Sequence, residues 1–111
     1  HTQQIKEALR IDEITTQQYS WRSKYKKTPA QIDLIIDRAD GMINLCELKY
    51  SEIDYTLTES EFNKMERRFA AFVSETGTRK GIFKTLITAC PLKKNQYSES
   101  IPVKLTADCL Y

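Results

Sequence analysis

The clearest pattern of hydrophobic and polar positions is a pair of alternating runs separated by Asp40-Gly41, a dipeptide typical of a tight hairpin turn. The first run, residues 31–38, predicts a strand, because the side chains of a strand point alternately to its two faces. Its predicted faces consist of Ile32, Leu34 and Ile36, and of Asp33, Ile35 and Asp37. The second run, residues 42–50, predicts the antiparallel partner strand of a hairpin.

The second predicted strand places a carboxylate and an ammonium group side by side. By the same alternation, its two faces consist of Ile43, Leu45, Glu47 and Lys49, and of Asn44, Cys46, Leu48 and Tyr50. Glu47 and Lys49 therefore project in the same direction. Antiparallel pairing brings Asp33 close to Glu47 only in a suitable register, because a slip of one residue turns a side chain to the other face.

Helical periodicity predicts two helices. Apolar residues recur at helical spacing near the start of the chain, which predicts a helix over residues 2–11. Thr58 and Glu61 match a capping box and Gly77 matches a C-cap, so a second helix is expected between them. Its apolar residues follow the helical period and indicate packing against a sheet: Phe62, Met65, Phe69, Phe72 and Val73.

The remaining segments predict strands and loops. Tyr19, Trp21 and Tyr25 share one parity in a segment rich in aromatic and β-branched residues, which predicts a strand over residues 15–25. A turn, a fourth strand, a polar loop and a last strand are expected over residues 26–29, 83–90, 93–101 and 103–109.

Together these elements predict one α/β domain, an α/β sandwich in which helices flank a mixed central sheet. The length, 111 residues, is that of a single domain over residues 1–111. Because the chain lacks an initial methionine and opens inside a predicted helix, we expect a domain excised from a longer protein. No apolar run approaches the roughly 20 residues of a membrane span, so no membrane partner is expected.

The cysteines and the charge change this picture little. Cys46, Cys90 and Cys109 are odd in number, and their spacing matches no zinc or redox motif. We expect them to be small core residues in a reducing, cytoplasmic compartment. The net charge is +2, but the basic residues gather in three clusters, which either form a solvated surface or contact phosphates. These clusters contain Arg22, Lys24, Lys26 and Lys27; Lys64, Arg67 and Arg68; and Lys93 and Lys94.

Asp33, Glu47 and Lys49 form the candidate chemical site. Hydrolysis of a phosphodiester requires a metal ion, an activated water and stabilisation of the developing charge. Carboxylates suit Mg²⁺ or Mn²⁺, so Asp33 and Glu47 are the candidate metal ligands, with the Leu48 carbonyl as a further oxygen. Lys49 is the candidate for orienting the water or stabilising the charge. Weaker candidates, for which surface roles are the alternative, are Glu7, Gln31, Asp37 and Arg38.

An acid-x-base triplet has little weight by itself. With 15 acidic and 17 basic residues in the chain, chance predicts roughly two such triplets, and two occur. The first is Glu47-Leu48-Lys49. The second, Glu66-Arg67-Arg68, lies in the middle of a predicted helix, where residues two apart do not share a face. The alternative reading of the first triplet is an ion pair at the edge of a sheet.

The segment around this site resembles a known family. Residues 31–51, QIDLIIDRADGMINLCELKYS, resemble the PD-(D/E)XK nuclease-like domain at the C-terminus of a family of bacterial and archaeal AAA+-type ATPases, most closely its Bacteroides-type members. Shorter matching pieces are QIKEAL at 4–9, SWRSK at 20–24, LIT at 86–88 and NQYS at 95–98. The resemblance covers nearly the whole chain.

The resemblance implies a restriction-endonuclease-like core of helix, three strands, helix and strand. It implies that Asp33, Glu47 and Lys49 occupy the metal and catalytic positions of a Mg²⁺- or Mn²⁺-dependent deoxyribonuclease. It also implies a further glutamate in a Phe-Glu pair upstream of residue 1, which Glu7 does not match. The ATPase module of the parent chain is a further implied partner; no Walker A motif occurs in these residues.

Three functions remain open at this point. The first is metal-dependent hydrolysis of DNA by a nuclease-like domain of an ATPase. The second is an inert module of the same fold that binds nucleic acid or regulates the ATPase, because a fold does not guarantee an activity. The third is an interaction domain in which Glu47 and Lys49 form only an ion pair.

Overall fold

The computed structural model describes residues 2–24, 30–49, 54–89 and 91–106. Three helices and five strands occur within these residues. In chain order they are α1 (Thr2–Ala8), β1 (Thr16–Arg22), β2 (Gln31–Arg38), β3 (Met42–Lys49), α2 (Glu59–Thr76), β4 (Gly81–Thr88), α3 (Gln96–Glu99) and β5 (Val103–Leu105). None of the helices in this part of the chain is both long and apolar enough to cross a bilayer.

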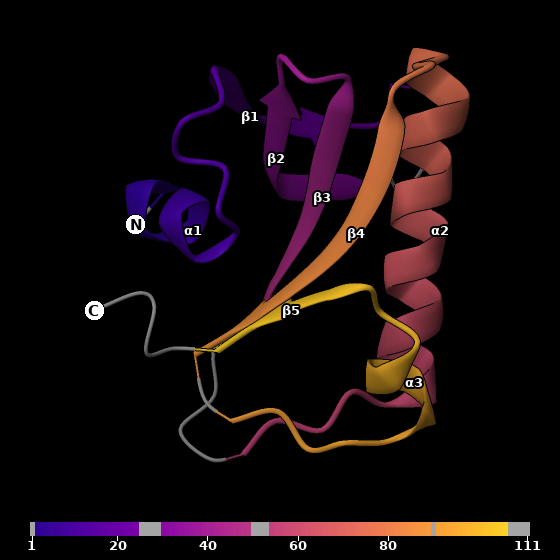
Figure 1. Ribbon diagram of the computed structural model, residues 1–111. Helices are drawn as coiled ribbons and strands as arrows, with labels where there is room; N and C mark the ends of the chain where they lie inside the picture. The colour runs from indigo at the N-terminus through magenta and orange to yellow at the C-terminus, as the bar shows by residue number, and fades with distance from the viewer. Residues whose placement is uncertain (1, 25–29, 50–53, 90, 107–111) are drawn as a thin grey trace.

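The five strands form one mixed sheet in the order β1-β2-β3-β4-β5. The β1–β2 and β2–β3 pairs are antiparallel, whereas the β3–β4 and β4–β5 pairs are parallel. The parallel step from β3 to β4 requires a crossover, and α2 provides it along one side of the sheet (Figure 1). The predicted class, an α/β fold with a mixed sheet flanked by helices, is confirmed.

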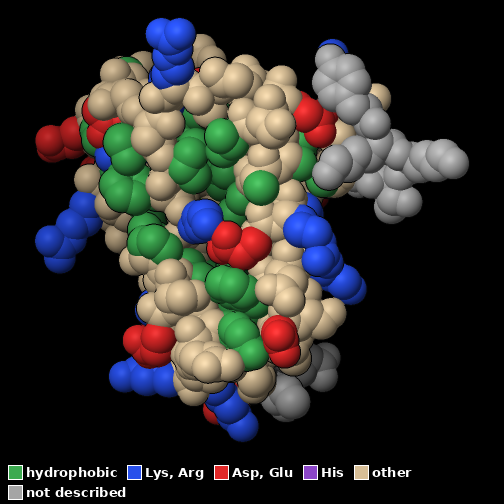
Figure 2. Space-filling model, turned by 90° about the vertical axis from the view of Figure 1, so that its right-hand side faces the viewer, with side chains coloured by type: hydrophobic (Ala, Val, Ile, Leu, Met, Phe, Trp, Pro, Cys, Tyr) green, Lys and Arg blue, Asp and Glu red, His purple; other side chains and the backbone are tan. Residues whose placement is uncertain are grey.

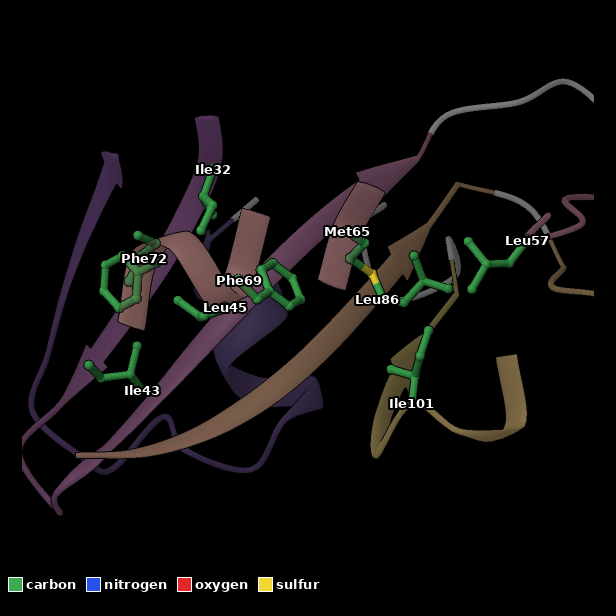
Figure 3. Close-up of a cluster of buried hydrophobic side chains, with 10 residues drawn as sticks. Ile32, Ile43, Leu45, Leu57, Met65, Phe69, Phe72, Leu86 and Ile101 are labelled. Carbon is green, nitrogen blue, oxygen red and sulfur yellow. The ribbon is translucent and has the colours of Figure 1, made fainter. Parts of the chain in front are cut away.

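Helix α2 covers one face of the sheet with its apolar stripe. Met65, Phe69 and Phe72 are fully buried, in one cluster with Leu45 of β3 and Leu86 of β4 (Figure 3). Burying an aliphatic or aromatic side chain of this size stabilises a fold by about 1.5–3 kcal/mol. This cluster therefore stabilises the strands that carry the candidate site.

The other face of the sheet packs against α1. Ile5 and Ile11 are buried there with Ile36 of β2 and Cys46 of β3. Cys46 is a free thiol, and burial raises its pKa to about 12. Its predicted role as a small core residue is confirmed. The other two cysteines, at positions 90 and 109, lie outside the described residues.

The N-cap and C-cap residues predicted for α2 occur where expected, but of the predicted capping box only the Thr58 half is present among the described residues. The Thr58 hydroxyl accepts a hydrogen bond from the backbone N–H of Glu61 at 3.2 Å. Gly77 ends the helix with φ +62°, in the left-handed region that favours glycine. The Glu61 carboxylate accepts a hydrogen bond from the Tyr55 hydroxyl, so its side chain links the helix to the preceding loop.

Strand β2 contains an irregularity that simple alternation did not predict. Between Tyr19 and Trp21 the pairing advances two residues along β1 but three along β2, from Ile35 to Ile32. One extra residue on β2 is the signature of a β-bulge. As a result, Ile32 joins Ile35 in the α2-side cluster. The prediction that Ile32 shares a face with the other even-numbered apolar residues of this strand is wrong.

Several predicted boundaries also change. The loop expected over residues 93–101 contains α3, whose N-cap Asn95 accepts hydrogen bonds from the N–H groups of Tyr97 and Ser98. Helix α1 ends at Ala8 and not at residue 11. Parts of the predicted strands and turns at residues 25–29, 50 and 107–109 lie outside the described residues.

Candidate functional site

Glu47 and Lys49 lie side by side near the end of β3, on the face that α2 covers. Residues Ile43 and Leu45 of the same parity belong to the α2-side core, which confirms the predicted strand faces. The Lys49 Nζ atom lies 3.4 Å from Glu47 Oε1. The side chain of Glu47 is 13% exposed and that of Lys49 is 28% exposed. The pair therefore sits where the core meets solvent.

Arg68 of α2 also binds the Glu47 carboxylate. Its Nη2 atom donates a hydrogen bond to Glu47 Oε1 at 2.6 Å, and the side chain of Arg68 is 26% exposed. Charge-assisted bonds of this kind are stronger than neutral ones. Two cations thus share one carboxylate oxygen. The Arg68 Nε atom is buried and has no hydrogen-bond partner within the described part of the chain.

Asp33 lies at the same end of the hairpin but makes a different contact. The paired register of β2 and β3 ends with Leu34 opposite Cys46, so Asp33 and Glu47 follow directly beyond the last pair. Asp33 is exposed, and its Oδ1 atom accepts a hydrogen bond from Gln31 Nε2 at 3.1 Å. No ion pair within the described ranges joins Asp33 to Lys49, whose partner is Glu47.

The weaker candidates have contacts of their own. Glu7 is exposed on α1, the helix that packs against the opposite face, and accepts a hydrogen bond from Gln3. Asp37 pairs with Lys80, and Arg38 pairs with Asp40 at 2.6 Å. Asp37 and Arg38 lie at the turn end of the hairpin, away from Glu47.

The donor atoms at Glu47 and Asp33 fit a hydrated divalent cation in their chemistry. Both offer carboxylate oxygens, and among the described residues Glu47 Oε2 has no hydrogen-bond partner. Mg²⁺ is commonly held by one or two carboxylates together with several waters. The described ranges contain no cluster of three His, Cys, Asp or Glu residues that could hold a metal ion. The candidate ligand set is therefore two carboxylates.

Two surface pockets lie away from these residues. One, of about 360 Å³, lies beside α2 and β4, where hydrophobic side chains gather on the face in Figure 2; its lining consists of Glu66, Phe69, Ala70, Val73, Ser74, Ile82 and Lys84. Glu66 and Lys84 form an ion pair there. The other, of about 250 Å³, is at the turn end of the hairpin; its lining consists of Thr15, Thr16, Gln17, Asp37, Arg38, Ala39 and Lys80.

Arg68 is the residue at this site that the sequence did not single out. It belongs to the second acid-x-base triplet, which the helical geometry made uninformative, and to one of the three basic clusters. One signal was present: Arg68 lies one position before the buried Phe69 and four before Phe72, on a helix whose apolar stripe faces the sheet. A residue beside such a stripe, as Arg68 is, lies near the solvent-exposed ends of the strands that the helix covers.

Comparison with known proteins gives one structural similarity. No protein-family model matches the chain, and no curated protein matches it. The chain is similar to the crystal structure of a protein of unknown function, AF1548, with a TM-score of 0.61 and 16% sequence identity. The similarity covers 91% of this chain and 53% of AF1548. At this identity the similarity shows the fold alone, an α/β arrangement shared over nearly all of these residues.

Proposed function

We propose that this chain is a nuclease-like domain with a restriction-endonuclease-like core, and that it hydrolyses phosphodiester bonds of DNA with Mg²⁺ or Mn²⁺. The observation that carries the proposal is the convergence of Glu47, Lys49 and Arg68 at the solvent edge of the sheet, with Asp33 at the same end of the hairpin. The order α1-β1-β2-β3-α2-β4 also matches the core implied by the resemblance.

The residues of the chain have separate roles in this proposal. Asp33 and Glu47 hold the divalent cation, which when bound polarises the phosphate and lowers the pKa of a water. Lys49 orients the attacking water or stabilises the negative charge that develops on the phosphate oxygens. It can do so because its side chain is partly exposed and its Nζ atom lies beside Glu47.

Further basic side chains support DNA as the substrate. Arg22 is exposed and lies opposite Gln31 in the β1–β2 ladder, two residues from Asp33. Lys64 is exposed one helical turn before Arg68 on α2. These positions border the candidate site from a strand and from a helix. Phosphate contacts of this kind supply most sequence-independent affinity for DNA and weaken as salt increases.

A DNA cleavage assay with paired variants tests the proposal. Plasmid and branched DNA are incubated with Mg²⁺ or Mn²⁺ and with the chain, or with the longer polypeptide that the resemblance implies. Glu47→Gln and Lys49→Met should each lower the cleavage rate by about a hundredfold or more. Asp37→Asn and Lys80→Met are matched controls, because each removes one partner of another Asp/Glu–Lys ion pair, at the turn end of the hairpin.

The controls should cleave at the wild-type rate, with circular dichroism confirming that all variants fold. Equal cleavage by wild type, Glu47→Gln and Lys49→Met would remove the catalytic assignment.

The second function is a nucleic-acid-binding or regulatory module without catalysis. It is favoured by the neutralisation of Glu47 by Arg68 and by the two-carboxylate ligand set. This module would bind DNA with a salt-dependent affinity and leave it intact in both metals. In that case the DNA is shifted in a gel-shift assay and yet stays intact, both with the chain and with the longer polypeptide. That result decides for the second function.

A further inference from the structure

Arg68 is held at Glu47 in a position that leaves one of its donors unsatisfied. Its Nη2 atom bonds Glu47 Oε1 at 2.6 Å, but its buried Nε atom finds no partner among the described residues. A buried donor without an acceptor has lost its hydration without replacement, which destabilises that arrangement. The contact with Glu47 is therefore strong at one nitrogen and incomplete at another.

The charges around Glu47 are also unbalanced. Arg68 and Lys49 both approach the same Oε1 atom, so one negative charge faces two positive charges. Asp33, the next carboxylate along this end of the hairpin, accepts from the neutral amide of Gln31. The guanidinium and the ammonium group beside Glu47 can each attract an anion such as a phosphodiester. While Arg68 remains at Glu47, these two cations disfavour a divalent cation at the same carboxylate.

We propose that Arg68 competes with a divalent cation for Glu47 and that, once released, Arg68 binds a phosphodiester of the nucleic acid. The inference rests on the proposed function, because it concerns the same site. The planar guanidinium suits this exchange, since its fork of donors matches both carboxylate and phosphate oxygens. Release from Glu47 also frees the buried Nε atom to find an acceptor.

This exchange couples two binding events. A cation at Glu47 releases Arg68, so it strengthens the binding of phosphodiester, and bound phosphodiester strengthens the binding of the cation by the same factor. Arg68 is thus a positioning residue whose contact changes with the occupancy of Glu47. A purely structural Arg68 would tie α2 to β3 and would show no such coupling.

The first measurement is the affinity of the full chain for Mn²⁺, determined by electron paramagnetic resonance. Arg68→Gln should bind Mn²⁺ about tenfold more tightly than Arg67→Gln, because a hydrogen bond between charged groups is worth roughly that factor in an equilibrium constant. Arg67 is the matched control, since it is the adjacent helix residue, is exposed and carries the same charge. Adding Glu47→Gln to Arg68→Gln should abolish the gain.

The second measurement is the affinity for a short DNA duplex, by fluorescence anisotropy with Ca²⁺ or with a chelator. Ca²⁺ should strengthen DNA binding by wild type and by Arg67→Gln, and this strengthening should be lost in Arg68→Gln. The competition is overturned if Arg68→Gln and Arg67→Gln have equal Mn²⁺ affinities, or if Ca²⁺ strengthens DNA binding equally in both. Thermal melts establish that both variants are folded.

The outcomes separate this inference from the proposed hydrolysis. Tighter Mn²⁺ binding by Arg68→Gln without cleavage by any variant supports the competition and rejects hydrolysis. Cleavage that depends on Glu47, with Mn²⁺ affinity independent of Arg68, supports hydrolysis and rejects the competition. Absence of Mn²⁺ binding in every variant rejects both.

Discussion

The two ends of the β2–β3 hairpin carry similar charged residues but use them differently. At the turn end, Lys80 pairs with Asp37, and Arg38 donates through two nitrogens to Asp40. The third nitrogen of the Arg38 guanidinium donates to the buried Asn44 at 3.1 Å. The guanidinium of Arg38 also lies 5.4 Å from the centre of the Phe83 ring. Each charge at this end has a partner of opposite sign.

At the end of the hairpin opposite the turn, here called the open end, the pairing of charges is incomplete. Arg68 and Lys49 share one oxygen of Glu47, and Asp33 has an amide partner. The difference teaches that charged residues at the two ends of one hairpin can have different sets of partners. The fully paired set stabilises the turn, whereas the proposed function requires the set at the other end to keep charges available for a ligand. The following variants test this contrast, from the largest expected effect to the smallest.

Removing the arginine at the turn end should destabilise the protein more than removing the arginine at the open end. Arg38→Met leaves the Asn44 side-chain oxygen buried without its donor and should lower the free energy of unfolding by about 2 kcal/mol. Arg68→Met leaves Lys49 beside Glu47 and removes an unsatisfied donor, so the loss should be below about 1 kcal/mol. Urea unfolding at neutral pH measures both; a larger loss in Arg68→Met contradicts the contrast.

Changing the turn itself should have a smaller effect, confined to stability. Gly41 has φ +88° and open space where a Cβ would lie, so Gly41→Ala meets only the backbone penalty. We expect a loss of about 1 kcal/mol in urea unfolding. Gly41→Asn should lose less, because asparagine tolerates positive φ better than alanine does. If Gly41→Ala changes Mn²⁺ affinity at the open end, the two ends are not independent.

Cys46 reports on the buried core of the hairpin, in the last pair of its register, opposite Leu34. In a Cys90→Ser/Cys109→Ser background, a thiol reagent should label Cys46 only when the protein unfolds. Its folded pKa, about 12, is raised above the ordinary value of 9.0 by burial. The stability that the neutral thiol provides is complete below the ordinary value and is lost as pH rises through the folded value. Rapid labelling of the native protein at mildly alkaline pH would contradict this.

The smallest effect is expected at Asp40, which is exposed. The hydrogen bond from Arg38 holds the pKa of Asp40 below its ordinary value of 3.8. A depressed carboxyl pKa provides stability above the ordinary value and loses it as pH falls through the folded value. Asp40→Asn should therefore reduce the loss of stability in acid, measured by urea unfolding as a function of pH. An unchanged acid profile would show that Asp40 is not coupled to folding.

Local sequence signals were sufficient for much of the fold. Asp40-Gly41 predicted the turn and Thr58 and Gly77 the ends of α2, because turns and caps depend on the conformational preferences of a few adjacent residues. The parity of β3 also held, which placed Glu47 and Lys49 together on the α2 side. The short helix α3 was missed, since its cap at Asn95 lies within a polar segment that carries no helical periodicity.

Other features depended on residues far apart in the chain. The bulge in β2 followed from pairing with β1, and strand alternation within residues 31–38 contains no sign of it. The resulting position of Ile32 is set by the core that it fills with α2. A bulge is a relation between two strands, so one strand read by itself cannot reveal where it falls.

By itself, the sequence of this protein determined the hairpin, the main helix and the adjacency of Glu47 and Lys49, because these follow from local periodicity and turn chemistry. Only the tertiary structure decided that Arg68, 21 positions further along the chain, meets Glu47, and that this carboxylate faces two cations. The physical reason is that the packing of α2 across the sheet selects which helix residue reaches the rim of β3. The hydrophobic pattern of the helix alone does not determine which of its residues this is.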